Sequence, residues 1–424
     1  MDRRQFLQLL AATAFAGRAR AASALRVVVA GAGVIGASIA WHLAKAGTRV
    51  TVIDREGPAT HASRGSFAWI NATWSKQPQR YHRLNQAGVE GWRMLESELK
   101  LPVRWGGSLE GVADAAVDAG LPARVAEQLA WGEKTRLVDR AELASLEPRV
   151  DFGALRHVVF SGNDGATDPI AATRAFLDAA TAFGAKVEYP CELTGVTLFN
   201  GRVCAVQTSR GDIAADRLVL ATGAAADAGR RFAGWDLPQR IAPGLTAITA
   251  PMPRIVERVL WLPGVHMHQR ADGRLVLGEE AGPPANEAHA ARLAGQPSAF
   301  PSREIALEHA ERLRAAALKY VPGLGPLDFE DVRVCHRPMP LDGYPVLGAS
   351  PSRPDVYLAV THSGVTLAPV AGALVAQEIA GGAPAEALED FRPDRKFTAS
   401  TAHWRNSADR FPVERQASSG LRRE

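Results

Sequence analysis

Apolar and β-branched positions outline a strand–helix–strand unit near the start of the chain. Residues 25–30 form a short continuous apolar run, which is typical of a buried parallel strand. Residues 37–46 have a helical pattern that ends at Gly47, and residues 48–53 form a second strand that closes on Asp54. The pattern therefore predicts a βαβ unit, the beginning of an α/β fold.

The turn between the first strand and the helix carries candidate chemistry. Its sequence is Gly31-Ala32-Gly33-Val34-Ile35-Gly36, and Asp54 follows eighteen residues after the last glycine. Two glycines let the backbone turn and approach a pyrophosphate at the helix N-terminus, and the third lets helix and strand pack closely. A carboxylate at the end of the second strand accepts hydrogen bonds from ribose hydroxyls. The sequence predicts a dinucleotide site, against the alternative of a glycine turn that serves packing alone.

A later helix is predicted from its end signals. Asp168 is a good N-cap, Pro169 suits the first turn, and Gly184 supplies the C-terminal stop. Between them, apolar residues from Phe176 to Phe183 form a helical stripe. A catalytic role for Asp168 is the alternative, but its position favours capping.

Four further segments narrow the class of dinucleotide. Residues 61–71 form a loop after the second strand, and residues 214–224 form a buried strand that ends in a tight turn. Near the C-terminus, residues 337–348 begin with Arg337-Pro338, and residues 361–369 begin with Thr361-His362-Ser363-Gly364. In order and spacing these segments resemble the D-amino-acid-oxidase-like FAD oxidoreductases, the family of glycine oxidase, sarcosine oxidase and D-amino acid dehydrogenase.

The resemblance extends over about residues 24–397, with three departures from the family pattern. Asp54 stands where Glu is commoner, Thr361 stands where Gly often precedes the histidine, and Ala225 replaces an aromatic residue. The last two substitutions affect the expected shape of the active site rather than the binding of FAD.

The resemblance implies an α/β fold in two parts. A Rossmann-like FAD-binding domain is expected to be discontinuous, over residues 24–80, 155–230 and 325–400. The intervening residues, 81–154 and 231–324, are expected to form a substrate domain with a mainly antiparallel sheet.

The resemblance also implies which residues bind FAD. Leu193 is expected to offer its backbone to the adenine ring, and the amides at the start of the last long helix are expected to face flavin O2. A helix N-terminus there stabilises the anionic reduced flavin. The full set is Gly31, Gly33, Val34, Ile35, Gly36, Asp54, Arg55, Ser63, Arg64, Ser66, Leu193, Ala221, Thr222, Gly223, Gly348, Ser363, Gly364, Val365 and Thr366.

In this family a C–H bond next to an amine nitrogen delivers hydride to flavin N5, and the resulting imine hydrolyses. The resemblance therefore implies an FAD-dependent oxidoreductase acting on a small-molecule amine or amino acid, reoxidised by oxygen or a respiratory electron acceptor. The alternatives are a flavin-binding protein without amine oxidase activity and an NAD(P)-linked oxidoreductase.

Candidate catalytic residues come from three segments. Arg337 occupies the position at which glycine oxidase and its relatives bind the substrate carboxylate, and a planar guanidinium suits that role. A structural ion pair is the alternative, with Arg333 in reserve on the same strand face. His362 can line the flavin or serve as a structural hydrogen-bonding group, and Asn71 is expected near the isoalloxazine.

Two histidines, His266 and His268, alternate with apolar residues and therefore share one face of a strand. They resemble active-site wall residues opposite the flavin. Because no third ligand is apparent, no metal site is expected. Trp69 is expected either beside the isoalloxazine or in the core.

Cys335 raises the question of covalent attachment. In sarcosine oxidase a cysteine seven residues before an aspartate is joined to the flavin, and Cys335 and Asp342 keep this spacing. The surrounding residues look more like glycine oxidase, which holds FAD noncovalently. A buried, unreactive thiol is therefore favoured over a covalent bond.

Composition and charge add the cellular setting. The chain has 424 residues, of which 46% are hydrophobic and 22% charged, as in ordinary globular proteins. The net charge is +4, but residues 1–21 hold four arginines and one aspartate, so nucleic-acid binding is not expected. Residues 1–22 resemble a twin-arginine signal peptide, beginning Asp2-Arg3-Arg4-Gln5-Phe6-Leu7 and ending in small residues.

Such a signal predicts recognition by export machinery and a periplasmic or secreted protein that is exported folded. An N-terminal helix of a cytoplasmic protein and an uncleaved membrane anchor are the alternatives. Residues 401–424 are expected to form an irregular tail.

Overall fold

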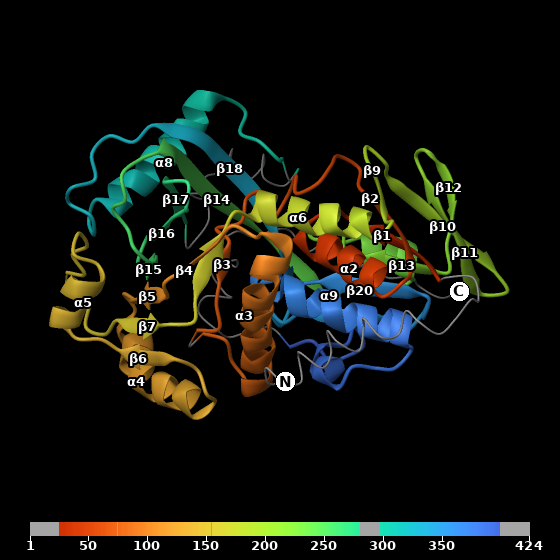
Figure 1. Cartoon of the computed structure of the whole chain (residues 1–424), viewed down its shortest axis with the longest axis horizontal. Coiled ribbons are helices and arrows are strands. Elements are labelled where there is room, and N and C mark those ends of the chain that lie inside the picture. Colours follow the sequence, from red (N-terminus) through yellow and green to blue (C-terminus); the bar gives the residue numbers. More distant parts are fainter. Residues whose placement is uncertain (1–24, 74, 154, 280–294, 296, 399–424) are drawn as a thin grey trace, which may run out of the picture.

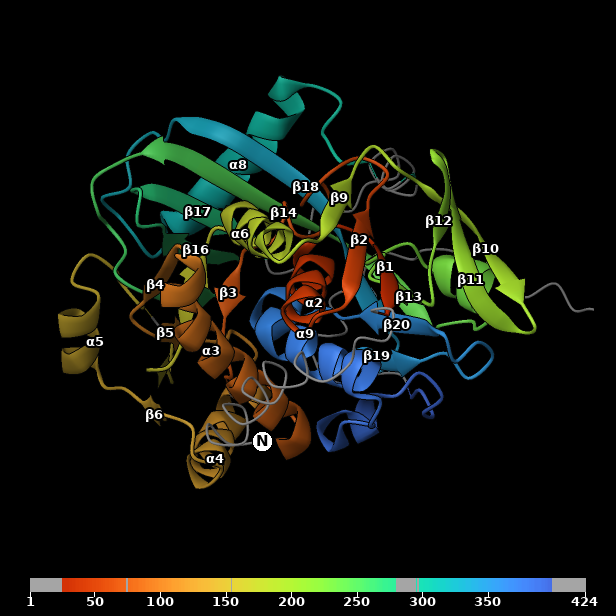
Figure 2. The same cartoon turned by 45° about the vertical axis from the view of Figure 1, so that its right-hand side comes forward.

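The computed structural model describes residues 25–73, 75–153, 155–279, 295 and 297–398. The predicted signal peptide and the predicted tail lie outside the described residues. Figures 1 and 2 show two adjoining parts, a mainly parallel sheet flanked by helices and a longer antiparallel sheet covered by α8. The predicted α/β fold with a second, mainly antiparallel sheet is confirmed.

The first sheet contains the predicted βαβ unit. Strands β1 (Arg26–Ala30) and β2 (Arg49–Ile53) are parallel neighbours joined by helix α2 (Val34–Lys45). The order of the six strands is β19-β20-β13-β1-β2-β9, and all neighbours are parallel except β19 and β20. The remaining strands are β9 (Lys186–Glu188), β13 (Arg217–Leu220), β19 (Val346–Ala349) and β20 (Val356–Val360).

Helices α2, α3 (Gln79–Leu99), α6 (Pro169–Ala182) and α9 (Gly364–Gly381) pack beside this sheet (Figure 2). Their shared core includes the fully buried side chains of Trp41, Trp92 and Phe176. A Cβ on Gly372 of α9 would lie 2.4 Å from Ser38 Oγ of α2. The two helices therefore approach closely at this glycine.

Helix α9 contains Pro369 in its second turn. Proline has no N–H, so the carbonyl of Val365 lacks its helical donor. The indole Nε1 of Trp92 donates to that carbonyl at 2.8 Å. Among the described residues α9 is the one helix long and apolar enough to cross a membrane. Its residues Gly364–Gly381 are 67% buried inside the protein.

The second sheet has eight strands in the order β18-β14-β17-β16-β15-β5-β7-β6, with one parallel pair, β5 and β15. Helix α8 (Arg303–Ala317) covers one face, over a core that includes Met267 and Leu277. The strands are β5 (Ser108–Glu110), β6 (Thr135–Leu137), β7 (Val159–Ser161), β14 (Gln239–Pro251), β15 (Val259–Leu262), β16 (Val265–Gln269), β17 (Arg274–Gly278) and β18 (Phe329–Pro340).

Shorter elements complete the fold. Strands β3 (Trp69–Ile70), β8 (Gly165–Thr167) and β4 (Val103–Trp105) form one small sheet. Strands β10 (Leu193–Phe199), β11 (Arg202–Thr208) and β12 (Gly211–Ala214) form another. The other helices are α4 (Ala115–Ala130), α5 (Arg140–Leu146), the π-helical turn η2 (Gly229–Ala233) and the 3₁₀ helix η3 (Glu386–Phe391).

The sheets do not follow the predicted segment boundaries throughout. Strands β7 and β18 lie in residues expected in the FAD-binding domain, yet they pair within the eight-stranded sheet. Helix α3, expected in the substrate domain, packs against α9 because Leu84, Trp92 and Leu95 join its core. Strand pairing and burial, rather than position in the sequence, therefore decide which sheet or core each of these elements joins.

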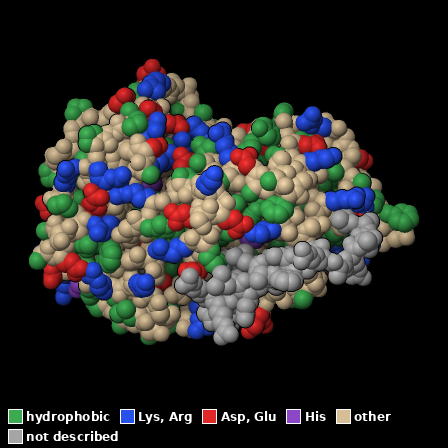
Figure 3. Space-filling model, viewed as in Figure 1, with side chains coloured by type: hydrophobic (Ala, Val, Ile, Leu, Met, Phe, Trp, Pro, Cys, Tyr) green, Lys and Arg blue, Asp and Glu red, His purple; other side chains and the backbone are tan. Residues whose placement is uncertain are grey.

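The predicted helix ends are confirmed around α6. Asp168 accepts hydrogen bonds from the amides of Ile170 and Ala171, and Gly184 has a φ of +90° just past the helix. The predicted apolar stripe is wrong at Phe183, which is 52% exposed because it lies at the C-cap, beyond the packed turns. On the face shown in Figure 3, basic and acidic side chains are interspersed.

Candidate active site

The glycine turn between β1 and α2 forms a backbone cradle. A Cβ on Gly31 would lie 2.3 Å from the carbonyl oxygen of Ala221, and one on Gly36 would lie 1.9 Å from the carbonyl oxygen of Gly31. A Cβ on Gly33 would meet only Ser63 Oγ, at 3.1 Å. The first and third glycines are therefore required by the packing of the fold, whereas Gly33 borders open space beside the helix N-terminus.

Asp54 and Ser63 hold this cradle in shape. The carboxylate of Asp54 accepts from the amide of Ala32 at 2.8 Å, and its other oxygen accepts from the amides of Glu56 and Gly57. Ser63 Oγ accepts from the amide of Val34 at 2.9 Å. A carboxylate has about four acceptor sites, so Asp54 retains capacity for a ribose hydroxyl.

The N-terminus of α9 lies beside the strand β3 and the loop after it. Thr366 Oγ1 donates to the carbonyl of Trp69 and accepts from the amide of Asn71, both at 3.2 Å. Ser363 Oγ is held by Lys76 Nζ at 3.1 Å and by the hydroxyl of Tyr81 at 2.8 Å. The start of the helix is thus fixed by side chains from residues 69–81.

Arg337 lies on β18, opposite Ala242 of β14, on the sheet face turned away from α8. It is partly buried, and its Nη2 donates to the carbonyl of Pro243 at 3.0 Å. Its Nε is buried without a hydrogen-bond partner among the described residues. Burial lowers the pKa of Arg337, and the carboxylate of Glu279 acts in the opposite direction.

The guanidinium of Arg333, the reserve candidate, already makes hydrogen bonds within the protein. Its Nε donates to Asp331 at 2.7 Å, and its Nη1 donates to the carbonyl of Arg64 at 2.8 Å. Arg64 in turn donates to both carboxylate oxygens of Asp331. These contacts tie the loop of residues 61–71 to β18.

His266 and His268 share the same face of β16, as the alternation predicted, while Val265 and Met267 point into the core under α8. Burial lowers the pKa of both histidines to about 3, so both imidazoles are neutral at physiological pH. His268 Nε2 lies 2.9 Å from the carbonyl oxygen of Phe67; since a carbonyl only accepts, that nitrogen carries the hydrogen. Within the described ranges no group of three His, Cys, Asp or Glu residues could hold a metal ion.

The comparisons with known proteins decide the family. Residues 26–378 match the family described as "FAD dependent oxidoreductase".

The chain belongs to the FAD-dependent oxidoreductase family.

Its relatives include a glycine oxidase of Bacillus licheniformis, 26% identical over 390 residues, which span 87% of this chain and 97% of the relative. An opine oxidase polypeptide of Agrobacterium tumefaciens (strain Ach5) is 25% identical over 399 residues, or 89% of this chain and 98% of the relative.

Solved structures show the same fold. The L-proline dehydrogenase from P.horikoshii superposes with a TM-score of 0.75 at 23% identity, covering 88% of this chain and 97% of that one. The glycine oxidase from Geobacillus kaustophilus gives a TM-score of 0.76 at 21% identity, covering 88% of this chain and 100% of that one.

The residues present in this flavoprotein-family chain fit FAD. Space is left beside Gly33 at the N-terminus of α2, where a pyrophosphate is stabilised. Near the N-terminus of α9, Asn71 Oδ1 and Thr361 Oγ1 are buried without hydrogen-bond partners in the described part of the chain. Buried polar atoms are normally paired, so these two indicate room for a polar ligand.

The other predicted cofactor residues lie in several separate segments. Ala221, Thr222 and Gly223 follow β13 beside Gly31, whereas Leu193 begins β10. Arg55 is exposed beside Glu56, Ser66 Oγ accepts from the amide of Ala68, and Ile35 is the second residue of α2. Gly348 lies on the edge strand β19, where a Cβ would be 2.7 Å from Pro393. Packing against Pro393 therefore leaves no room for a side chain at Gly348, and its predicted contact with FAD stays a prediction.

Cys335 is buried between two glycines of the site. A Cβ on Gly65 would lie 2.2 Å from Cys335 Cβ, and one on Gly244 would lie 3.2 Å from its sulfur. Burial raises the pKa of the thiol to about 11. The three cysteines of the chain are free thiols, and Cys335 is buried as the sequence favoured. That FAD is held without a covalent bond to Cys335 stays a prediction.

Nothing in the sequence indicated that Asp164 and Trp261 would lie near the residues of the candidate site. Asp164, in the turn between β7 and β8, accepts from Trp69 Nε1 at 3.1 Å and from Ser108 Oγ at 2.7 Å. Burial raises the pKa of Asp164 to about 8. Trp261 of β15 stacks on His266 with ring centroids 3.4 Å apart. These contacts join segments that are far apart in the chain.

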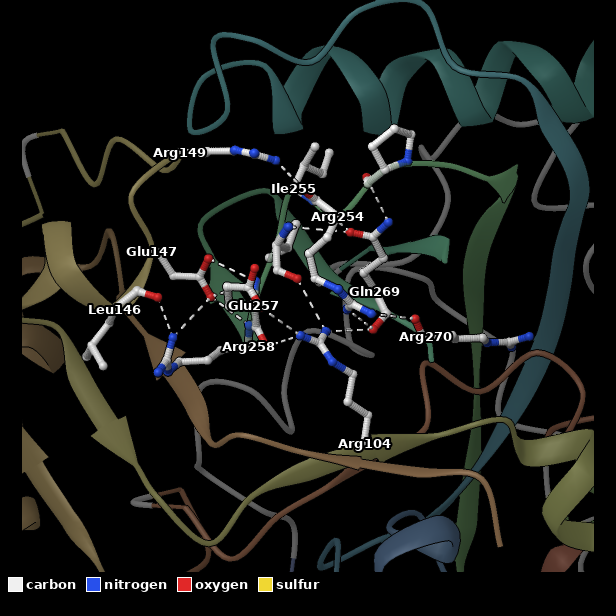
Figure 4. A network of polar contacts seen from close by, with 12 residues as sticks. Arg104, Leu146, Glu147, Arg149, Arg254, Ile255, Glu257, Arg258, Gln269 and Arg270 are labelled. Atoms are coloured by element: carbon white, nitrogen blue, oxygen red, sulfur yellow. Dashed lines mark hydrogen bonds and ion pairs between the residues drawn. The ribbon is translucent and has the colours of Figure 1, made fainter. Parts of the chain in front are cut away.

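A polar network supports the end of β16 that follows His268 (Figure 4). The buried amide of Gln269 accepts from Ile255 and donates to three backbone carbonyls, the nearest being Gly273 at 2.7 Å. Arg104 donates to the carbonyl of Gln269 at 2.7 Å. Glu147 is 1% exposed and accepts from the amides of Glu257 and Arg258. The network fixes the loop before β15 and β16 and so positions both histidines.

Proposed function

We propose that this flavoprotein oxidises an amino acid, and that Arg337 binds the carboxylate of the substrate. The observation that carries the proposal is the partly buried guanidinium of Arg337, with an unpartnered Nε among the described residues, on the sheet face that also bears His266. A guanidinium fork binds a carboxylate bidentately. The relatives named for glycine, D-amino acids and opines support a substrate of this kind.

FAD, when bound, supplies the hydride acceptor for a C–H bond next to an amine nitrogen. The amides from Ser363 to Thr366, at the N-terminus of α9, would stabilise negative charge on its pyrimidine ring. Its pyrophosphate would lie beside Gly33 at the N-terminus of α2, and the carboxylate of Asp54 would accept from its ribose. His266 and His268 would form one wall of the site, and because burial lowers their pKa values to about 3, both would be uncharged at physiological pH.

The test is an anaerobic screen of the purified flavoprotein. Glycine, sarcosine, D- and L-amino acids and simple amines are mixed with it, and loss of the flavin absorbance is followed. We expect bleaching by a carboxylate-bearing amine and weaker binding of that amine in Arg337→Lys. Bleaching by none of the amines overturns the proposal, and bleaching by NAD(P)H alone favours an NAD(P)-linked activity. Repeating the oxidation with oxygen or with a quinone then identifies the electron acceptor.

We also propose that the protein is exported with FAD already bound. The support is the Arg3-Arg4 pair ahead of Phe6-Leu7, in residues outside the described ranges. Arg3→Lys combined with Arg4→Lys should leave the precursor in the cytoplasm. Unchanged delivery to the periplasm contradicts export by this route, and the same assay with Arg26→Lys, in β1, is the control.

A further inference from the structure

Four rings from two segments of the chain, residues 67–69 and 261–266, form an aromatic wall, which we define as Phe67, Trp69, Trp261 and His266. Trp69 and Trp261 lie with ring centroids 4.9 Å apart, and Trp261 stacks on His266 at 3.4 Å with an interplanar angle of 22°. Phe67 meets His266 edge-on at 5.7 Å. Both tryptophans remain partly exposed, whereas Leu260 and Leu262 of the same strand β15 are buried beneath them.

The aromatic wall lies between the two functional ends of the proposed site. At one end the carbonyl of Trp69 accepts from Thr366 Oγ1 at the N-terminus of α9. At the other end the positive charge of Arg337 acts on His266. A ligand whose carboxylate binds Arg337 and whose reacting carbon approaches the start of α9 therefore has this wall beside its remaining substituent.

The charges around the aromatic wall favour an apolar substituent. His266 is neutral, because burial lowers its pKa to about 3. Burial raises the pKa of Asp164, which anchors Trp69, to about 8 and so disfavours negative charge beside the aromatic wall. Glu110, opposite Trp261 on β5, is the buried carboxylate that could attract a cation to the same surface, and the experiment below includes a cationic probe for this reason.

We propose that the aromatic wall is the side-chain subsite, and that the substrate is an amino acid with an aromatic or large aliphatic side chain. The inference rests on the proposed function, since Arg337 must fix the carboxylate. Offset and edge-on ring contacts stabilise such a side chain beyond the burial of its area. Glycine and sarcosine have no side chain to fill the subsite and are expected to be poor substrates.

The test measures binding of carboxylates that cannot be oxidised. Acetate, 3-methylbutanoate, phenylacetate and (trimethylammonio)acetate are titrated into the FAD-loaded protein, and the perturbed flavin spectrum gives each dissociation constant. Phenylacetate is expected to bind at least about tenfold more tightly than acetate, equal to about 1.4 kcal/mol. Trp261→Ala should reduce the ratio of the two dissociation constants to about one, and Trp261→Phe should retain most of the ratio.

Phe199→Ala is the matched control, because Phe199 is 70% exposed at the tip of the β10–β11 hairpin. It should change no dissociation constant. Equal binding of acetate and phenylacetate overturns the inference. So does tighter binding of (trimethylammonio)acetate than of phenylacetate, or the wild-type ratio of phenylacetate to acetate binding in Trp261→Ala. If Trp261→Ala fails to fold or to bind FAD, Trp261→Leu and the wild-type ratio decide.

The proposed function fails separately. In that case no carboxylate perturbs the flavin and no amino acid bleaches it. If amino acids still bleach the flavin while glycine is oxidised as fast as phenylalanine, only the subsite is overturned.

Discussion

The cradle after β1 and the face of the antiparallel sheet satisfy their polar groups in different ways. In the cradle, backbone amides are the main hydrogen-bond donors. Asp54 and Ser63 accept hydrogen bonds from these amides rather than from other side chains. On the face of the eight-stranded sheet that bears Arg337, the polar groups are buried imidazole, guanidinium and carboxyl side chains. Several of their atoms have no hydrogen-bond partner in the described chain. The comparison teaches that the cradle depends on backbone shape, whereas the sheet face depends on side-chain chemistry.

The largest effect should come from filling the cradle. Gly33→Val should weaken FAD binding by about 100-fold or more, equal to about 2.8 kcal/mol. A side chain there occupies space that a pyrophosphate must enter, yet it meets only Ser63 Oγ and leaves the fold intact. Flavin content after purification and thermal unfolding of the apoprotein measure the two quantities separately.

Gly31→Val sharpens the same comparison. Its Cβ would lie 2.3 Å from the carbonyl oxygen of Ala221 at a φ of +112°, so the fold itself should fail. Stoichiometric FAD in Gly33→Val, or an equally folded Gly31→Val, would contradict this account of the cradle.

On the sheet face, a conservative change should have a large effect. Arg337→Lys keeps the positive charge and loses the planar fork, so binding of an amino-acid substrate should weaken by about 1.5–3 kcal/mol. A simple amine without a carboxylate should be affected much less. Arg353→Lys is the control, since Arg353 donates to the carbonyl of Phe232, beside the other sheet. Equal losses for both ligands would mean that Arg337 is structural.

A third prediction concerns stability and pH. Burial raises the pKa of Asp164 from 3.8 to about 8, so the folded protein keeps a proton that the unfolded chain releases. The free energy of unfolding therefore falls as pH rises between about 4 and 8, by up to about 1.4 kcal/mol per pH unit. Asp164→Asn should flatten this dependence in denaturant titrations.

Glu147→Gln is the matched variant for this measurement. Burial raises the pKa of Glu147 to about 7, so its contribution should end near that pH. Between pH 7 and 8 only Asp164→Asn should change the slope. The same slope in both variants and the wild type would show that these acids ionise normally.

The smallest effect is expected at Cys335. A thiol whose pKa is raised to about 11 is a poor nucleophile, so acid precipitation should release all the flavin. Cys335→Ala should retain FAD as the parent does. Yellow colour that stays with the precipitate, and disappears in Cys335→Ala, would establish a covalent bond.

The cradle could be predicted from residues that are close together in the sequence. Much of the sheet face could not, because its residues are brought together by pairing between distant strands. The strand, glycine turn, helix and Asp54 lie within thirty residues, so one stretch of sequence holds the whole pattern. Trp69 meets Asp164 across 95 residues of chain and Trp261 across about twice that distance. Nothing local to Trp261 or Asp164 encodes these contacts, because they depend on which strands become neighbours. Resemblance to a family supplied Arg337, whereas alternation along a strand paired His266 with His268.

The order of strands in the first sheet has a consequence for how the protein is made. Strand β1 lies between β2 and β13, and β13 is completed on its other side only by β20, which ends at Val360. The amides at the start of α9 come later still, from residue 364 onward. A growing chain therefore holds Gly31 and Asp54 long before it holds the other end of the cofactor site. Both ends of the proposed cofactor site are therefore present only after the chain has been synthesised past residue 366. Passage across a membrane in the folded state, as proposed above, suits a protein assembled in this order.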